Sequence, residues 1–160
     1  MVSDTRQIPA GGEGTITIKV NTNGYGGHTL KKKILFVSND PQNSQLGLKI
    51  FGRVEKIVTV TPKNVRFGGY AGKPIKSIVR IVPEKKYPFK IVKAIAKIGT
   101  YIKFELKEIK KSDRLQYELV IENIKMDKGN YHDQIYLYTD SKLKSRITIN
   151  VYSKILPNRI

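Results

Sequence analysis

The 160-residue sequence contains no cysteine and no tryptophan. The absence of cysteine excludes disulfide bonds, thiolate metal ligands and cysteine nucleophiles together. No apolar run approaches the roughly 18–20 residues that a membrane-spanning helix needs. The first residues, MVSDTRQIPAGGEG, contain no apolar stretch resembling a secretory signal peptide. We therefore expect neither a disulfide framework nor a membrane span in this segment.

Acidic residues are scarce relative to basic ones, since 13 Asp and Glu stand against 30 Lys and Arg and give a formal net charge of +17. A charge of this size predicts attraction to polyanions and says nothing about the fold. The densest basic runs are Lys31, Lys32 and Lys33, and Lys110 and Lys111. These lysines are the candidate contacts for an anionic polymer. The alternative is that lysines cover the solvent faces of strands, where they discourage edge-to-edge pairing.

A pattern near the N-terminus returns near the C-terminus after 101 positions, where residues 15–56 align without a gap on 116–157. Ile34 falls on Ile135 and Leu48 on Ile149. Self-similarity at a fixed offset indicates repeated structural units, here of about 100 residues. We expect residues 57–160 to form a complete unit and residues 1–56 to be the C-terminal half of a first one. The chain is then interpreted as a fragment of a longer protein.

Apolar and polar residues alternate with a period of two along most of the chain, which predicts half-buried strands. The first unit is expected to hold three strands, with a turn at NTNGYGG, and the complete unit seven or eight. Residues 68–74 are expected to form a turn. Residues 89–98 would also fit a short helix, but Pro88 and the Ile and Val content favour a strand. The predicted class is an all-β, antiparallel β-sandwich. The expected strands are 15–20, 30–37, 46–54, 57–61, 65–67, 75–82, 89–98, 101–109, 115–124, 131–139 and 145–155.

Several short motifs in residues 6–56 carry a family resemblance. They are Ile8-Pro9-x-Gly11, Gly14-x-Ile16-x-Ile18, Asn21-Thr22-x-Gly24-x-x-Gly27, Ser38-Asn39-Asp40-Pro41 and Leu48-x-Ile50-x-Gly52-x-Val54. On these residues the segment resembles an uncharacterised family of bacterial Ig-like domains, similar to the Hydin/ASH-type and major-sperm-protein-like sandwiches. The resemblance reaches the second unit mainly through the repeat, where Asp40-Pro41 becomes Ser141-Lys142.

This resemblance implies tandem Ig-like modules, the first truncated to its C-terminal three strands, in an exported or cell-surface bacterial protein. It therefore implies a periplasmic or surface location, and it implies no activity.

Residues that could support catalysis or bind a metal lack the necessary spacing. His28 and His132 have no further ligands at the spacing of a zinc site. Asp127, Asp133 and Asp140 gather around a glycine without the calcium-loop pattern. The motifs G-x-S-x-G and H-E-x-x-H and a phosphate-binding glycine loop are not found. Aromatic pairs on adjacent strands, as in single-strand nucleic-acid binders, are not recognised either. We expect no catalytic residue, no metal and no cofactor.

The sequence leaves two functional hypotheses. The first is a non-enzymatic Ig-like structural or protein-interaction module of a larger bacterial envelope or surface protein, with another protein or a neighbouring domain as partner. The alternative is a basic β-domain that binds nucleic acid or an anionic cell-surface polymer. The half-unit would expose one apolar face, so it is expected to pack on the second unit, to form a homodimer through that face, or to be poorly ordered. The residues of that face are Ile16, Ile18, Val20, Ile34, Phe36, Leu48 and Ile50.

Overall fold

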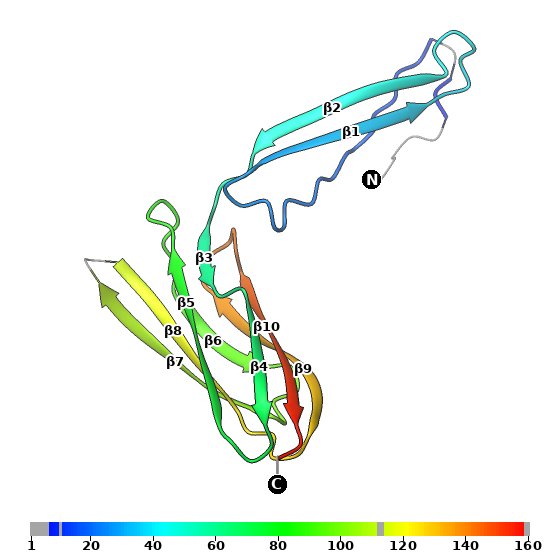
Figure 1. Cartoon of the computed structure of the whole chain (residues 1–160). Helices are drawn as coiled ribbons and strands as arrows, with labels where there is room; N and C mark the ends of the chain where they lie inside the picture. Colours follow the sequence, from blue (N-terminus) through cyan, green and yellow to red (C-terminus); the bar gives the residue numbers. More distant parts are fainter. Residues whose placement is uncertain (1–6, 10, 112–113, 159–160) are drawn as a thin grey trace. The chain divides into compact units, whose positions relative to one another are not determined.

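A computed structural model describes residues 7–9, 11–111 and 114–158 (Figure 1). The chain divides into two compact units, Met1–Lys56 and Ile57–Ile160. The described residues form ten strands and no helix, so the protein is all-β as predicted. Within the described part of the chain, no helix is long and apolar enough to cross a membrane.

The described residues of the first unit form a single antiparallel hairpin of β1 (Thr29–Val37) and β2 (Gln45–Arg53). The expected NTNGYGG turn is present, and Gly24 and Gly27 adopt φ angles of 86° and 84° that favour glycine. The N–H of Gly27 donates to the carbonyl of Val54 at 2.8 Å, which closes the open end of the hairpin.

The strand predicted at residues 15–20 is wrong, because these residues belong to no strand. In the repeat they align with β8 (Arg114–Asn123), which pairs with β5 (Ile75–Pro83) and β7 (Ile102–Lys111). The described residues of the first unit contain no equivalents of β5 and β7. Alternating Ile16, Ile18 and Val20 therefore lack the partner strands that a ladder requires.

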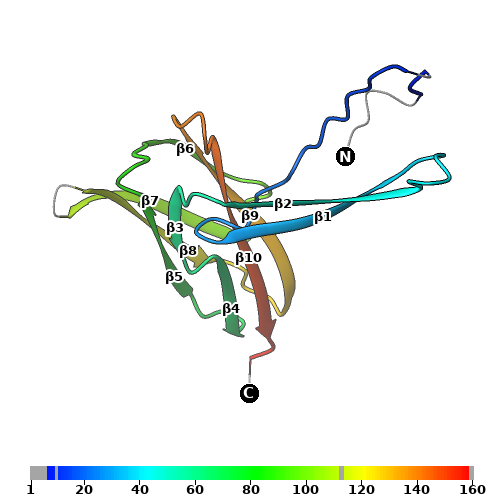
Figure 2. The same ribbon diagram turned by 90° about the horizontal axis from the view of Figure 1, so that it is seen from above.

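The second unit consists of two four-stranded sheets, with the strand orders β4-β10-β9-β6 and β3-β5-β8-β7. Every pairing is antiparallel except that of β4 with β10, which is parallel. Figures 1 and 2 show the two sheets as separate layers of this unit. The architecture is that of a β-sandwich. The remaining strands are β3 (Val58–Thr61), β4 (Asn64–Tyr70), β6 (Ile91–Ala96), β9 (Gly129–Thr139) and β10 (Arg146–Leu156).

Two local predictions in this unit have different outcomes. Residues 91–96 form strand β6, which confirms the strand interpretation of that segment over a helix. The turn expected at 68–74 is wrong in its first half, because residues 68–70 continue β4. Pairing with β10 over residues 150–156 extends the ladder through these glycines. A Cβ on Gly69 would lie 2.6 Å from Cδ1 of Ile75, so a side chain there would force a shift.

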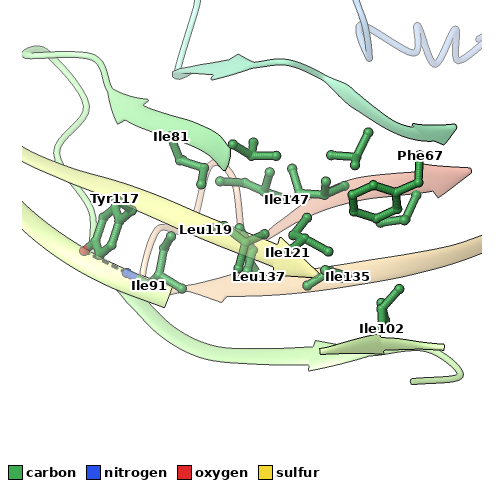
Figure 3. Packing of buried hydrophobic residues seen from close by; sticks show 14 of the residues in the cluster. Phe67, Ile81, Ile91, Ile102, Tyr117, Leu119, Ile121, Ile135, Leu137 and Ile147 are labelled. Atoms are coloured by element: carbon green, nitrogen blue, oxygen red, sulfur yellow. Dashed lines mark hydrogen bonds between the residues drawn. The ribbon is translucent and has the colours of Figure 1, made fainter. Parts of the chain in front are cut away.

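The hydrophobic core lies between the two sheets of the second unit (Figure 3). Inward positions alternate along β8, β9 and β10, and the most buried of them have no exposed surface. Burying a side chain of this size contributes about 1.5–3 kcal/mol, so this layer is the main source of stability. The fully buried residues include Val79, Ile81, Tyr117, Leu119, Ile121, Ile135, Leu137, Ile149 and Val151.

The hairpin of β1 and β2 has the same register as the hairpin of β9 and β10, displaced by 101 residues. Ile34 lies opposite Leu48, as Ile135 lies opposite Ile149. The burial differs sharply, because Leu48 is 43% exposed and Ile149 is 0% exposed. The described residues of the first unit provide no second sheet to cover the equivalent apolar face.

The loops that close the two hairpins also use equivalent hydrogen bonds. The backbone N–H of Ser38 donates to Ser44 O at 3.0 Å, and that of Thr139 donates to Ser145 O at 3.0 Å. The hydroxyl groups of Ser38 and Thr139 each donate to the carbonyl five residues later. Side-chain hydroxyls thus organise both turns in the same way.

Candidate binding surface

The lysines singled out from the sequence are distributed over the two units, Lys31 to Lys33 in the first and Lys110 and Lys111 in the second. Lys31, Lys32 and Lys33 lie within β1 with exposed side chains, and neighbouring positions of a strand point to opposite faces. Nζ of Lys32 lies 5.7 Å from the ring centroid of Tyr25. Lys33 lies opposite Lys49, a pairing of like charges. The basic run is therefore divided between the two faces of the hairpin.

Lys110 and Lys111 end strand β7 in the other unit. Lys110 is exposed and lies opposite Leu115. The backbone of Lys111 lies opposite Arg114, but its side chain is outside the described residues. The two neighbouring positions again alternate between faces of the sheet.

The outer face of the β3-β5-β8-β7 sheet carries charges of both signs in register. Glu122 lies between Lys76 and Lys103, and Glu118 lies between Arg80 and Lys107. The Lys76–Glu122 and Arg80–Glu118 pairs are 3.4 and 3.2 Å apart. The carboxylates of this face therefore compensate its cations.

The outer face of the other sheet has a different composition, which sequence analysis did not recognise. Outward positions of β4, β10 and β9 form rows across the sheet, such as Arg66, Tyr152 and His132. We call this surface the β10 face. Its described side chains include amides, aromatic rings and cations, and no carboxylate. Its residues are Asn64, Arg66, Asn130, His132, Gln134, Tyr136, Tyr138, Arg146, Thr148, Asn150, Tyr152 and Lys154, with Lys93 and Ile95 of β6 beside them.

A chain of side-chain hydrogen bonds crosses the β10 face. The hydroxyl of Tyr136 donates to Oε1 of Gln134 at 2.9 Å, and Nε2 of Gln134 donates to Oδ1 of Asn150 at 2.9 Å. Nδ2 of Asn150 then donates to Oδ1 of Asn64 at 3.1 Å. Each amide is held in one orientation, and the chain ends at the exposed Asn64 amide nitrogen on β4.

Three aromatic rings of the β10 face, those of His132, Tyr136 and Tyr152, are paired with neighbours. The rings of His132 and Tyr152 stack with centroids 4.6 Å apart and planes at 19°. The guanidinium carbon of Arg146 lies 4.9 Å from the ring centroid of Tyr136. A shallow, open depression of about 550 Å³ lies beside the first pair, and its lining includes Arg66, Tyr152 and His132. One face of each of these three rings is therefore covered by a neighbour within the protein.

The sequence held a signal for this surface. Residues 130, 132, 134, 136 and 138 are polar or aromatic at every second position, while the residues between them form the core. In the structure, the register of β9 and β10 places His132 beside Tyr152. Sequence analysis did not recognise this pair of rings on adjacent strands. It failed because the pairing depends on register between two strands, which spacing within each strand does not give.

The residues considered for metal binding or catalysis have structural roles or exposed positions. Asp133 is buried, and its carboxylate accepts hydrogen bonds from the N–H groups of Ile98 and Gly99 at 3.0 and 2.8 Å. Oδ1 of Asp140 accepts one from the N–H of Lys90 at 2.8 Å. His28 lies in the turn before β1. Among the described residues, no three His, Asp or Glu side chains gather as a metal site would require.

A second depression, of about 680 Å³, lies at the end of the unit that holds the loop between β5 and β6. Its lining combines Lys85, Lys90 and Arg114 with Glu84 and Asp140. Oε1 of Glu84 accepts a hydrogen bond from the hydroxyl of Thr59 at 3.0 Å. Because acids and bases are mixed here, this depression lacks the uniform charge of the β10 face.

These observations define an all-β protein with a sandwich-like unit and a polar, aromatic sheet face. No family model and no curated protein matches the sequence. Among solved structures, the chain is similar to a protein of unknown function from Porphyromonas gingivalis W83. The two share 7% sequence identity and a TM-score of 0.51, over 83% of this chain and 68% of that one. This likeness concerns the fold alone.

Proposed function

We propose that the chain is a non-enzymatic Ig-like interaction module of a larger bacterial envelope or surface protein. The observation that carries the proposal is strand order. A constant-type Ig domain has strands A, B, E and D in one sheet and C, F and G in the other. We name β3 strand A, β5 strand B, and β6, β7, β8, β9 and β10 strands C, D, E, F and G. The sheet β3-β5-β8-β7 then has the order A-B-E-D, and β6, β9 and β10 of the other sheet have the order C-F-G. β4 is then an additional strand beside G, in parallel.

A tandem arrangement, with the first copy truncated, is supported by the common register of the two hairpins. In this interpretation β1 and β2 correspond to strands F and G of the second copy. The apolar residues Ile34 and Leu48 would then belong to a sandwich whose other sheet comes from elsewhere.

Binding to another macromolecule fits the surfaces of the second unit. Sandwich modules bind through strand edges, by adding a strand of the partner, or through sheet faces. The edge strands here are β4, β6, β3 and β7. An envelope location rests on the resemblance of residues 6–56 to bacterial Ig-like domains.

Co-sedimentation with isolated cell envelopes tests this function. The purified chain is expected to sediment with envelopes in a saturable manner, and excess unlabelled chain is expected to displace the labelled chain. A heat-unfolded sample serves as the control for non-specific retention. Sedimentation that rises linearly with concentration, without displacement, would contradict the proposal.

The second candidate function is polyanion binding, and the carboxylate-free β10 face on a chain of net charge +17 favours it. Such binding weakens steeply as salt is raised, because condensed counterions are released on association. Affinity that stays constant between low and physiological salt would argue against it.

A further inference from the structure

We infer that the β10 face binds a linear anionic polysaccharide, one that carries hydroxyl groups together with carboxylate or sulfate groups. The inference deepens the second candidate function and rests on it, since it names the class of polymer and the surface that holds it. It is carried by the charges, the hydrogen-bond donors and the arrangement of rings on this face.

Charge distinguishes this face from the opposite one. On the β3-β5-β8-β7 sheet, Glu122 and Glu118 separate the cations of each row. On the β10 face, Arg66, Arg146 and Lys154 form no ion pair with any described residue, and none of the rows contains an acid. An anionic ligand would therefore meet positive charge here without repulsion from a neighbouring carboxylate.

The cations lie toward both ends of the face. Arg146 begins the outward positions of β10 and Lys154 lies near its other end. Lys93 lies in the row of Arg146, on the far side of Tyr138, and Arg66 lies opposite Tyr152, one outward position from Lys154. At ~3.3 Å per residue, Arg146 and Lys154 are about 26 Å apart along the strand. This spacing suits an extended polymer that lies along β10 and presents anionic groups at intervals.

Between the cations, the face offers hydrogen-bond donors. The hydrogen bonds from Tyr136 through Gln134 and Asn150 to Asn64 all run in one direction. The last amide nitrogen, on Asn64, is left to donate outward at the edge of the sheet. Sugar hydroxyl and ring oxygens are acceptors that such fixed amides can bind.

The rings argue for a polysaccharide over a nucleic acid. Single-strand nucleic-acid binders gain about 1–3 kcal/mol per base by stacking bases on open aromatic faces. Here His132 and Tyr152 stack on each other, and Arg146 covers a face of Tyr136. One face of each of these rings is thus already covered within the protein, which leaves fewer faces on which bases could stack.

The test is titration of a labelled heparin oligosaccharide with the full chain at several salt concentrations, followed by fluorescence anisotropy. The face variant combines Arg66→Gln, Arg146→Gln and Lys154→Gln. The matched control combines Lys31→Gln, Lys32→Gln and Lys33→Gln, which removes the same charge elsewhere. Circular dichroism melts check that both variants remain folded. Uncharged dextran and a single-stranded oligo(dT) of matched charge are the comparison ligands.

The face variant is expected to bind heparin about tenfold or more weakly, with a salt slope smaller by about 2 to 3 if each cation releases about one counterion, as on nucleic acids. The control triple should retain most of the affinity and slope. Asn150→Ala should weaken binding without changing the slope, because it breaks the donor chain and removes no charge. Dextran should not bind.

Three results would overturn the inference: equal losses in both triples, no heparin binding, or tighter binding of oligo(dT) that the face variant abolishes. The last result would show that the β10 face binds nucleic acid, and polyanion binding would remain supported as the second candidate function. Envelope co-sedimentation distinguishes the two proposals. If the chain binds envelopes but not heparin, the inference fails and the proposed Ig-like interaction module is still supported. Heparin binding without saturable envelope binding supports the inference and removes the envelope-module proposal.

Discussion

The hydroxyl of Tyr117 on β8 accepts a hydrogen bond from the backbone N–H of Ile91 on β6 at 3.1 Å (Figure 3). The two strands belong to different sheets, so this contact joins the layers through the core. Tyr117 has no exposed surface, and Ile91 begins a strand whose pairing with β9 is irregular at its first residues. The phenol therefore supplies the acceptor for an N–H that water does not reach.

Tyr117→Phe is expected to destabilise the second unit by about 1–3 kcal/mol, because the Ile91 N–H loses its partner in a buried place. Urea unfolding followed by circular dichroism measures the change. Tyr138→Phe, on the β10 face, is the control and should stay within about 0.5 kcal/mol of the parent. Equal stabilities of Tyr117→Phe and the parent would show that this bond contributes nothing.

Alkaline pH should destabilise the protein through the buried Tyr117 and the half-buried Tyr131. Burial raises the pKa of Tyr117, and it also raises the pKa of Tyr131, above the ordinary value of 10.0. A raised folded-state pKa means that the neutral phenol stabilises the fold below pH 10 and that this stability is lost as the pH rises through the raised value. Unfolding free energies measured from pH 9 upward should fall, with a smaller fall in Tyr131→Phe. If the unfolding free energy of Tyr131→Phe falls with pH as steeply as that of the parent, the raised pKa of Tyr131 is contradicted.

The two equivalent hairpins should respond differently to the same truncation. Ile149→Ala is expected to cost about 2–5 kcal/mol, since it leaves a cavity in the core. Leu48→Ala should cost less than about 1 kcal/mol, because nearly half of the leucine side chain already meets solvent. Urea unfolding with hydrogen exchange assigns each loss to its unit. A large loss for Leu48→Ala that depends on protein concentration would indicate a second copy covering the hairpin face.

Asp133 should fix the loop between β6 and β7. Asp133→Ala removes the acceptor for the N–H groups of Ile98 and Gly99, and we expect a loss of about 1–3 kcal/mol. Hydrogen exchange at residues 98 and 99 should accelerate relative to the rest of the sheet. Asp127→Ala, at an exposed position, is the matched control. Unchanged exchange at both amides would show that the carboxylate does not hold this loop.

Local patterns predicted most of the strands correctly. Alternation placed Ile34 and Leu48 on one apolar face, because successive side chains of a strand point to opposite faces. The repeat aligned Ile135 and Ile149 with them, and both are core residues. The turn glycines Gly24 and Gly27 were also identified, since their positive φ angles are a local requirement. The pairing register of β1 with β2 recurs in β9 with β10, displaced by 101 residues. Two strands joined by a short loop have few alternative registers.

The sequence alone determined the all-β class, the hairpins and the alternation of buried and exposed residues, since each depends on neighbours in the chain. Tertiary structure decided that residues 15–20 form no strand and that β4 extends through Gly68–Tyr70, because ladders require a partner strand from far along the chain. It also assembled the β10 face, where Asn64 contacts Asn150 across 86 residues of sequence. Such contacts depend on how strands are ordered in the sheet, and no spacing within a strand records that order.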